Sequence, residues 1–196
     1  MAQPGTLSNT NKVPVWVVYN DVALGYTEPG DITLTITQDW TDQTFHQTGS
    51  YLMDAYLKGH RATVQCSLSE TENVDMWEVA FAGGEEQNDT SSPPLERFAL
   101  GDKVEQALGY FIGRKASTGA KELKLIPVSQ YTTASTHTGD DIVIPKAWCR
   151  SVGDIVYSID NNVALPCTFE AIFDPTDSTG MGLLFRGILT GTWTAV

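Results

Sequence analysis

The side chains best suited to metal binding or catalysis are scattered along this chain. Its three histidines, His46, His60 and His137, lie far apart, and none is spaced with a cysteine or a second histidine as a zinc site requires. No Gly-x-Ser-x-Gly turn is present, and no serine–histidine–aspartate set stands out among many candidates. The sequence therefore offers no metal site and no recognisable hydrolase.

Two short stretches have the composition of ligand-binding loops without the spacing. GYFIGRKAS, residues 109–117, has the wrong glycine spacing for a phosphate-binding loop and has alanine after the lysine. DPTDSTG, residues 174–180, has oxygen ligands suited to calcium but an incomplete spacing, so we interpret it as a turn. The paired acids at 85–86 and 140–141 are interpreted as solvated loop residues. We expect no enzymatic activity, no cofactor and no metal.

Composition and length indicate one globular domain. The chain has 196 residues, 41% of them hydrophobic and 10% aromatic, which is enough to bury a core. No apolar run approaches the roughly 20 residues that span a bilayer. The first 12 residues are polar and lack the basic and apolar regions of a signal peptide, so we expect a flexible N-terminal arm and no export.

The three cysteines are not expected to form a disulfide framework, and two of them, Cys66 and Cys167, are predicted to be core thiols. Cys66, Cys149 and Cys167 are far apart, and an odd count without a signal peptide argues against paired disulfides. Cys66 and Cys167 fall on the apolar sides of alternating segments, where a thiol packs as a small hydrophobic group.

Acidic residues dominate the charge. The formal net charge is −12, and residues 1–98 carry 14 acidic and 4 basic residues against 10 and 8 in residues 99–196. A chain without a basic patch should not bind a nucleic acid backbone. The acidity has two interpretations. It serves solubility alone, or it allows a surface of the protein to stay close to a polyanion without binding to it.

Most of the chain reads as β-strand. Apolar residues alternate in DITLTITQ (31–38), in GHRATVQCSL (59–68) and in LPCTFEAIF (165–173), and about nine or ten such segments are separated by Gly, Asn, Asp and Thr. Their spacing predicts a mainly β fold, an antiparallel β-sandwich or split barrel with one flanking α-helix, spanning residues 13–196.

One helix is predicted directly after the strand that ends at Leu68. Ser69 and Glu72 fit a capping box at its start. Helical spacing of the apolar residues then predicts a packing stripe on the helix, formed by Val74, Trp77 and Phe81.

Residues 39–59 are too long for an ordinary hairpin loop and too apolar for a solvated one. Such a segment needs a surface to bury against, either the core of its own domain or another subunit. We predict an inter-subunit arm whose contact residues are Trp40, Phe45, Tyr51, Leu52, Met53, Tyr56 and Leu57.

Two stretches resemble the major tail tube proteins of long-tailed bacteriophages. In residues 13–82, an alternating strand leads into a long loop with a Gly-small-x-x-x-Asp element, here Gly49-Ser50 to Asp54, and then into a strand and the helix. In residues 141–190, an apolar-Pro-Lys-Ala segment precedes a strand, and a Thr-Phe-x-Ala-x-x-Asp strand precedes a Gly-rich turn. Residues 83–140 match poorly and are interpreted as a loop or insertion region.

The resemblance implies a structural virion protein. It implies homo-hexameric rings that stack into a tail tube, assembled in the host cytoplasm, with DNA passing through the lumen during ejection without specific binding. It also implies tape-measure, tail terminator and distal tail proteins as partners, and no membrane. Glu170, a polar residue on an otherwise apolar strand, is a candidate lumen acid.

Other classes of function stay open at this point. The chain could be another ring-forming tail protein, such as a terminator, or a secretion-tube homologue. A carbohydrate-binding β-sandwich would use exposed aromatic residues as stacking platforms, with Trp148, Tyr157 and Trp193 as candidates. An enzyme that uses scattered acids is the least supported alternative.

Overall fold

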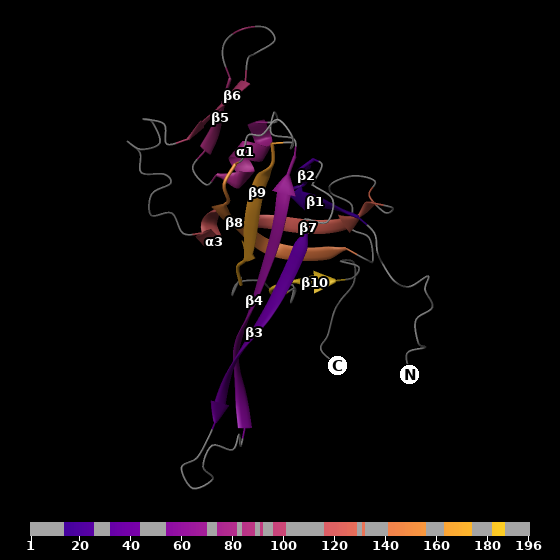
Figure 1. Ribbon diagram of the computed structural model, residues 1–196, viewed down its shortest axis with the longest axis vertical. Helices are drawn as coiled ribbons and strands as arrows, with labels where there is room; N and C mark the ends of the chain where they lie inside the picture. Colours follow the sequence, from indigo (N-terminus) through magenta and orange to yellow (C-terminus); the bar gives the residue numbers. More distant parts are fainter. Residues whose placement is uncertain are drawn as a thin grey trace.

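A single antiparallel sheet forms the body of the molecule in this computed structural model (Figure 1). The structure describes residues 14–25, 32–43, 54–69, 74–81, 84–88, 91, 96–100, 116–128, 131, 141–155, 163–173 and 182–186. Its strands are β1 (Val15–Tyr19), β2 (Val22–Ala23), β3 (Thr33–Gln43), β4 (Asp54–Leu68), β5 (Gly84–Asn88), β6 (Glu96–Leu100), β7 (Lys121–Pro127), β8 (Ile142–Val152), β9 (Leu165–Ala171) and β10 (Phe185–Arg186), and its helices are α1 (Val74–Ala80) and α3 (Ala116–Gly119).

The eight-stranded sheet is open and has the order β2-β1-β7-β8-β9-β4-β3, with β10 also paired to β8. Strands β5 and β6 form a separate two-stranded sheet beside α1. The mainly β, antiparallel fold with one short flanking helix that the sequence predicts is confirmed. The predicted N-terminal arm, residues 1–12, lies outside the described residues.

The sheet curls so that its two halves face each other across a common core. Strands β1 and β9 are separated by β7 and β8 in the sheet, yet the rings of Tyr19 on β1 and Phe169 on β9 lie 5.4 Å apart. The Tyr19 hydroxyl also donates a hydrogen bond to the Ala147 carbonyl of β8, at 3.2 Å. Phe169 is fully buried, and burying a side chain of this size stabilises the fold by about 2–3 kcal/mol.

Alternation along the central strands explains which residues fill that core. On β4, Ala62, Val64, Cys66 and Leu68 are buried, while the residues between them are exposed or half-buried. The predicted alternation of β9 is confirmed for its buried residues at 165, 167 and 169. Phe173, predicted on the same side, lies beyond the end of β9 and is exposed.

Strand β7 lies within residues 83–140, the region that matches the resemblance poorly. Lys121–Pro127 pairs with β1 on one side and β8 on the other, so it is a central strand of the main sheet. The rest of this region that the structure describes consists of β5, β6 and α3. Removing residues 83–140 would therefore split the sheet rather than trim a surface decoration.

Helix α1 buries two residues that the predicted stripe did not include. Met76 and Ala80, four residues apart, are buried in the core, whereas Trp77 and Phe81 are half-buried and stack on each other with ring centroids 5.6 Å apart. Phe81 still packs against the edge of the core. The side chain of Val74 and the capping residue Glu72 lie outside the described residues. Helix α1 has only seven residues, about two turns, and over so short a length the spacing of apolar residues does not decide which stripe faces the sheet.

Candidate interaction site

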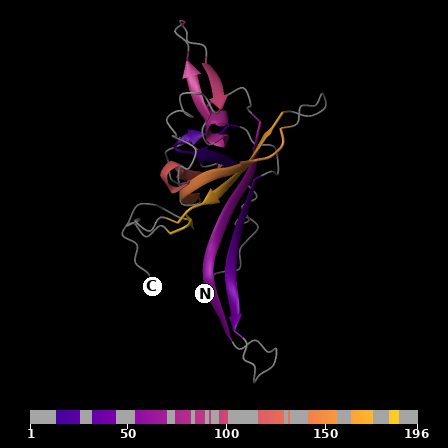
Figure 2. The same ribbon diagram turned by 90° about the vertical axis from the view of Figure 1, so that its left-hand side faces the viewer.

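The β3–β4 hairpin projects well beyond the body of the molecule (Figures 1 and 2). Residues 39–43 of β3 pair with residues 54–59 of β4, and we call these paired residues the arm. The prediction of a long loop over 39–59 is wrong for these residues, which form a β-ribbon. Of the predicted contact residues, the structure describes Trp40, Tyr56 and Leu57, and the other four lie outside the described residues: Phe45, Tyr51, Leu52 and Met53.

One side of the ribbon continues the core-facing side of the sheet. The register pairs on this side are Leu34 with Val64, Ile36 with Ala62, Gln38 with His60, and Trp40 with Leu57. Val64 and Ala62 are fully buried inside the body, whereas Trp40 on the arm is 50% exposed and Leu57 is 43% exposed. The apolar side that makes the core therefore runs outward past the point where the domain covers it.

A β-bulge keeps Trp40 and Leu57 on the same side. Asp39 pairs with Gly59 and Trp40 pairs with Leu57, so Lys58 is an extra residue in β4. Without that extra residue, Trp40 would face Lys58 and Leu57 would turn to the opposite side, because the side-chain period of a strand is two. The local backbone is thus arranged to present an apolar pair.

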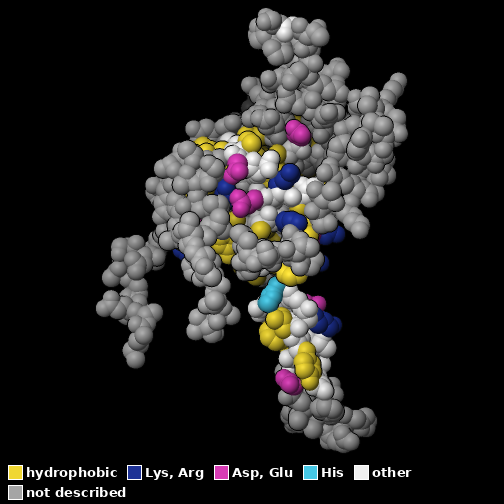
Figure 3. Space-filling model, turned by 180° about the vertical axis from the view of Figure 1, so that it is seen from behind, with side chains coloured by type: hydrophobic (Ala, Val, Ile, Leu, Met, Phe, Trp, Pro, Cys, Tyr) yellow, Lys and Arg dark blue, Asp and Glu magenta, His cyan; other side chains and the backbone are white. Residues whose placement is uncertain are grey.

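The opposite side of the arm carries a second aromatic residue. Tyr56 is 56% exposed and pairs with Thr41. The Thr41 hydroxyl oxygen is buried and has no hydrogen-bond partner among the described residues. The space-filling view shows hydrophobic side chains along the arm, interspersed with charged ones (Figure 3). Aromatic and leucine side chains held half-exposed on a projecting ribbon are typical of a surface that binds another protein.

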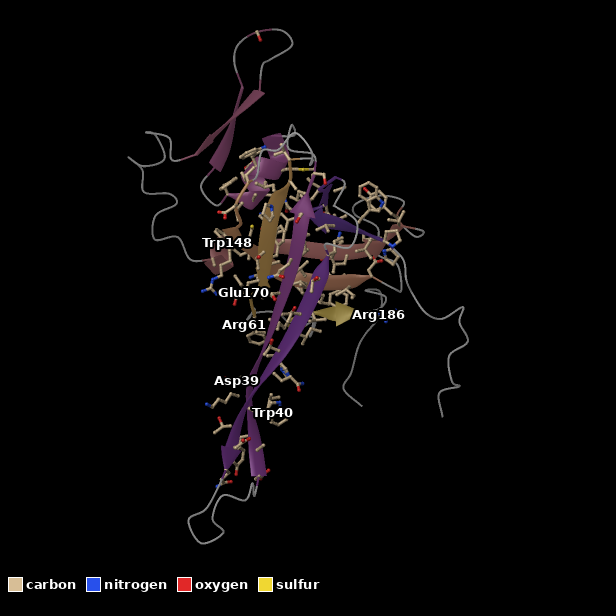
Figure 4. All side chains as sticks on the ribbon, in the orientation of Figure 1. Asp39, Trp40, Arg61, Trp148, Glu170 and Arg186 are labelled. Carbon is tan, nitrogen blue, oxygen red and sulfur yellow. The ribbon has the colours of Figure 1, made fainter. Side chains whose placement is uncertain are left out.

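Glu170 lies between two arginines on the other side of the sheet. Its carboxylate forms an ion pair with Arg61 Nε of β4 at 3.3 Å and a second ion pair with Arg150 of β8. Figure 4 labels Trp148, Glu170 and Arg61 in succession down the sheet. The prediction that Glu170 is a lumen acid loses its basis, because two guanidinium groups already compensate its charge.

The three cysteines meet in the core. Cys66 and Cys167 are register partners on β4 and β9, and all three thiols are free and buried. A hydrogen bond with Cys149, together with burial, raises the pKa of the Cys167 thiol above its ordinary range. The prediction that Cys66 and Cys167 are core thiols is confirmed, and a thiol held protonated in this way is a poor nucleophile.

Trp148 packs against its own chain. A Cβ atom placed on Gly119 of α3 would lie 1.9 Å from the Trp148 ring, so the ring covers that glycine. Such packing gives no support to Trp148 as a carbohydrate platform, and Tyr157 and Trp193 lie outside the described residues. The one described histidine, His60, is exposed, and no group of three or more potential metal ligands occurs in the described part of the chain.

Comparison with known proteins adds no assignment. No family model matches the chain, and no curated protein matches it. Within the described ranges, no helix is long and apolar enough to cross a membrane.

Proposed function

We propose that this protein is a tail tube subunit of a long-tailed bacteriophage. Copies would associate into hexameric rings, and the rings would stack into a tube through which DNA leaves the virion. The observation that carries this proposal is the arm, a β-ribbon that holds Trp40, Tyr56 and Leu57 outside the body of the subunit. The resemblance of the flanking segments to tail tube proteins supplies the class of assembly.

The arm suits contacts between unlike surfaces. It leaves the body at one end of the molecule, whereas α1, β5 and β6 lie at the other (Figures 1 and 2). An arm that docks on a different part of the next copy makes a heterologous contact, which generates closed rings or continuing stacks. A self-complementary dimer would need no such separation of the two surfaces.

The net charge is compatible with a DNA channel. At −12, the subunit repels phosphates overall, so DNA would pass without specific binding. Because Glu170 is compensated by Arg61 and Arg150, the repelling acids are to be sought elsewhere on the subunit. Tape-measure, terminator and distal tail proteins would bind the ends or the interior of such a tube.

The proposal is tested by concentrating the purified chain and following it by sedimentation velocity and negative-stain electron microscopy. Rings and hollow tubes are the expected result. A variant in which an Asn-Gly turn joins Trp40 directly to Leu57 removes the distal arm at a register pair, and it should remain a folded monomer. A wild-type chain that stays monomeric at every concentration would contradict the proposal, and single rings that never stack would indicate a terminator instead.

A further inference from the structure

The two arginines around Glu170 leave an excess of positive charge on a strongly acidic protein. Arg61 and Arg150 have side chains that are 68% and 67% exposed, whereas Glu170 is 18% exposed. Each guanidinium group has five N–H donors, and one carboxylate cannot use them all. We call these three residues the arginine clamp.

At the clamp, two cationic side chains converge on a single acid. At Lys124 the numbers are reversed: this one buried cation contacts two acids, Asp21 and Glu122. Guanidinium groups with free donors bind carboxylates and phosphates in a two-pronged geometry. The clamp is therefore suited to a second carboxylate or phosphate supplied from outside the subunit.

Another part of the same chain has the complementary charge. The sequence of α1, β5 and β6 carries five acids and a single base, Arg97; the acids are Asp75, Glu78, Glu85, Glu86 and Glu96. We call this region the acidic end. Figure 1 shows it at the end of the molecule opposite the arm.

We propose that the arginine clamp of one copy binds the acidic end of a neighbouring copy, an inference that rests on the proposed ring assembly. Two chains of net charge −12 repel each other, and a local pairing of opposite charges would offset this repulsion and favour one specific orientation. The clamp and the acidic end are different surfaces, so their contact is heterologous, the kind of contact that generates closed rings or continuing stacks. Nucleic acid is the less favoured occupant, because a single arginine pair on an acidic chain cannot outweigh its overall repulsion of phosphates.

The first test removes the whole clamp without leaving an unpaired charge. The triple variant Arg61→Gln, Arg150→Gln, Glu170→Gln lowers the net charge by one, and Lys121→Gln does the same at an exposed position on β7. At low salt, self-association of the triple variant should weaken roughly tenfold or more, whereas Lys121→Gln should associate like the wild type. Equal thermal unfolding of both variants and wild type shows that the fold is intact.

The second test asks whether the two surfaces touch each other. Glu85→Gln with Glu86→Gln removes two charges from the acidic end, and it should weaken association to a similar degree. Combining it with the clamp variant should add little further loss, because contacting groups are non-additive in a double-mutant cycle. Fully additive losses would overturn the proposed contact.

The remaining outcomes separate this inference from the proposed function. Rings that form normally in the clamp variant contradict the clamp contact and leave the tube proposal standing. A wild-type chain that never associates contradicts both. Labelled duplex DNA is the probe for the other occupant: if wild type binds it at low salt and the clamp variant does not, the clamp binds nucleic acid and the inference is wrong.

Discussion

Trp40 and Leu57 are register partners on the arm, and both side chains remain about half exposed although they continue the core-facing side of the sheet. Inside the body, the same side of β4 carries the fully buried Ala62 and Val64. The arm therefore extends an apolar surface into solvent, which is the feature that a partner subunit would cover.

Replacing this pair should separate assembly from folding. Trp40→Ser with Leu57→Ser should weaken self-association at least about 30-fold, because buried aromatic anchors dominate interface energies. The free energy of unfolding should fall by no more than about 1 kcal/mol, the usual range for one cross-strand pair. Sedimentation and urea unfolding measure the two effects. Phe173→Ser is the matched control, since Phe173 is 64% exposed but lies off the arm, and it should leave association unchanged.

A charge prediction concerns the buried Lys124. Its ammonium group lies 2.6 Å from Asp21 and 2.9 Å from Glu122. Burial lowers the pKa of Lys124, but hydrogen bonds to these two acids outweigh burial and raise it. Asp21→Asn removes one partner without straining the backbone, because asparagine tolerates the positive φ of 63° at this turn.

Asp21→Asn should lower the free energy of unfolding by about 1 kcal/mol, since a partly exposed acid compensates a buried cation. Urea unfolding measures the loss. Asp154→Asn changes another exposed acid, and it should have no effect. Equal stability of the two variants would show that Glu122 alone is enough to compensate Lys124.

Stability at high pH should depend on Tyr19. Burial raises the pKa of Tyr19 from 10.0 to about 12. Because the folded state holds this proton more tightly than the unfolded chain, the stabilisation is complete below pH 10.0 and is lost as the pH rises towards 12. The loss should approach about 1.4 kcal/mol per pH unit within that window.

Urea unfolding at a series of pH values tests this dependence. The raised pKa of the Cys167 thiol acts in the same direction, so Tyr19→Phe should flatten the decline without abolishing it. The variant also loses the hydrogen bond to the Ala147 carbonyl, which should cost about 1 kcal/mol at neutral pH. An unchanged slope in Tyr19→Phe would show that tyrosine ionisation does not limit stability.

Two glycine substitutions should have opposite effects. A Cβ at Gly119 would lie 1.9 Å from the Trp148 ring, whereas a Cβ at Gly59 meets nothing within 4 Å. Gly119→Ala should therefore destabilise the fold by roughly 1–3 kcal/mol and alter tryptophan fluorescence. Gly59→Ala should be neutral or stabilise it by about 0.5 kcal/mol. Thermal unfolding that ranks the pair in reverse would contradict the packing of Trp148 against α3.

Alternation made much of the sheet predictable. The segments that became β4 and β9 have one buried side, so apolar residues fall at every second position, as at Val64, Cys66 and Leu68 or at Leu165 and Cys167. The arm was not predictable as a ribbon, because residues 39–43 have no buried side to impose alternation. Its apolar residues pointed to a contact surface, but only the register shows that Trp40 faces Leu57.

The sequence alone could not predict which side chains from distant strands meet in the fold. Arg61, Arg150 and Glu170 come from three strands, and their meeting depends on how β4, β9 and β8 are aligned. The same holds for Cys149, whose approach to Cys167 follows from the bulged pairing of β8 with β9. Spacing along the chain contains no signal for either cluster.

Native mass spectrometry of the smallest stable assembly tests the central claim most directly. The claim predicts a species of six subunits, each of 21.4 kDa, which disappears when the distal arm is replaced by a two-residue turn. A chain that remains a monomer at all concentrations, or that forms only dimers unaffected by loss of the arm, would contradict it.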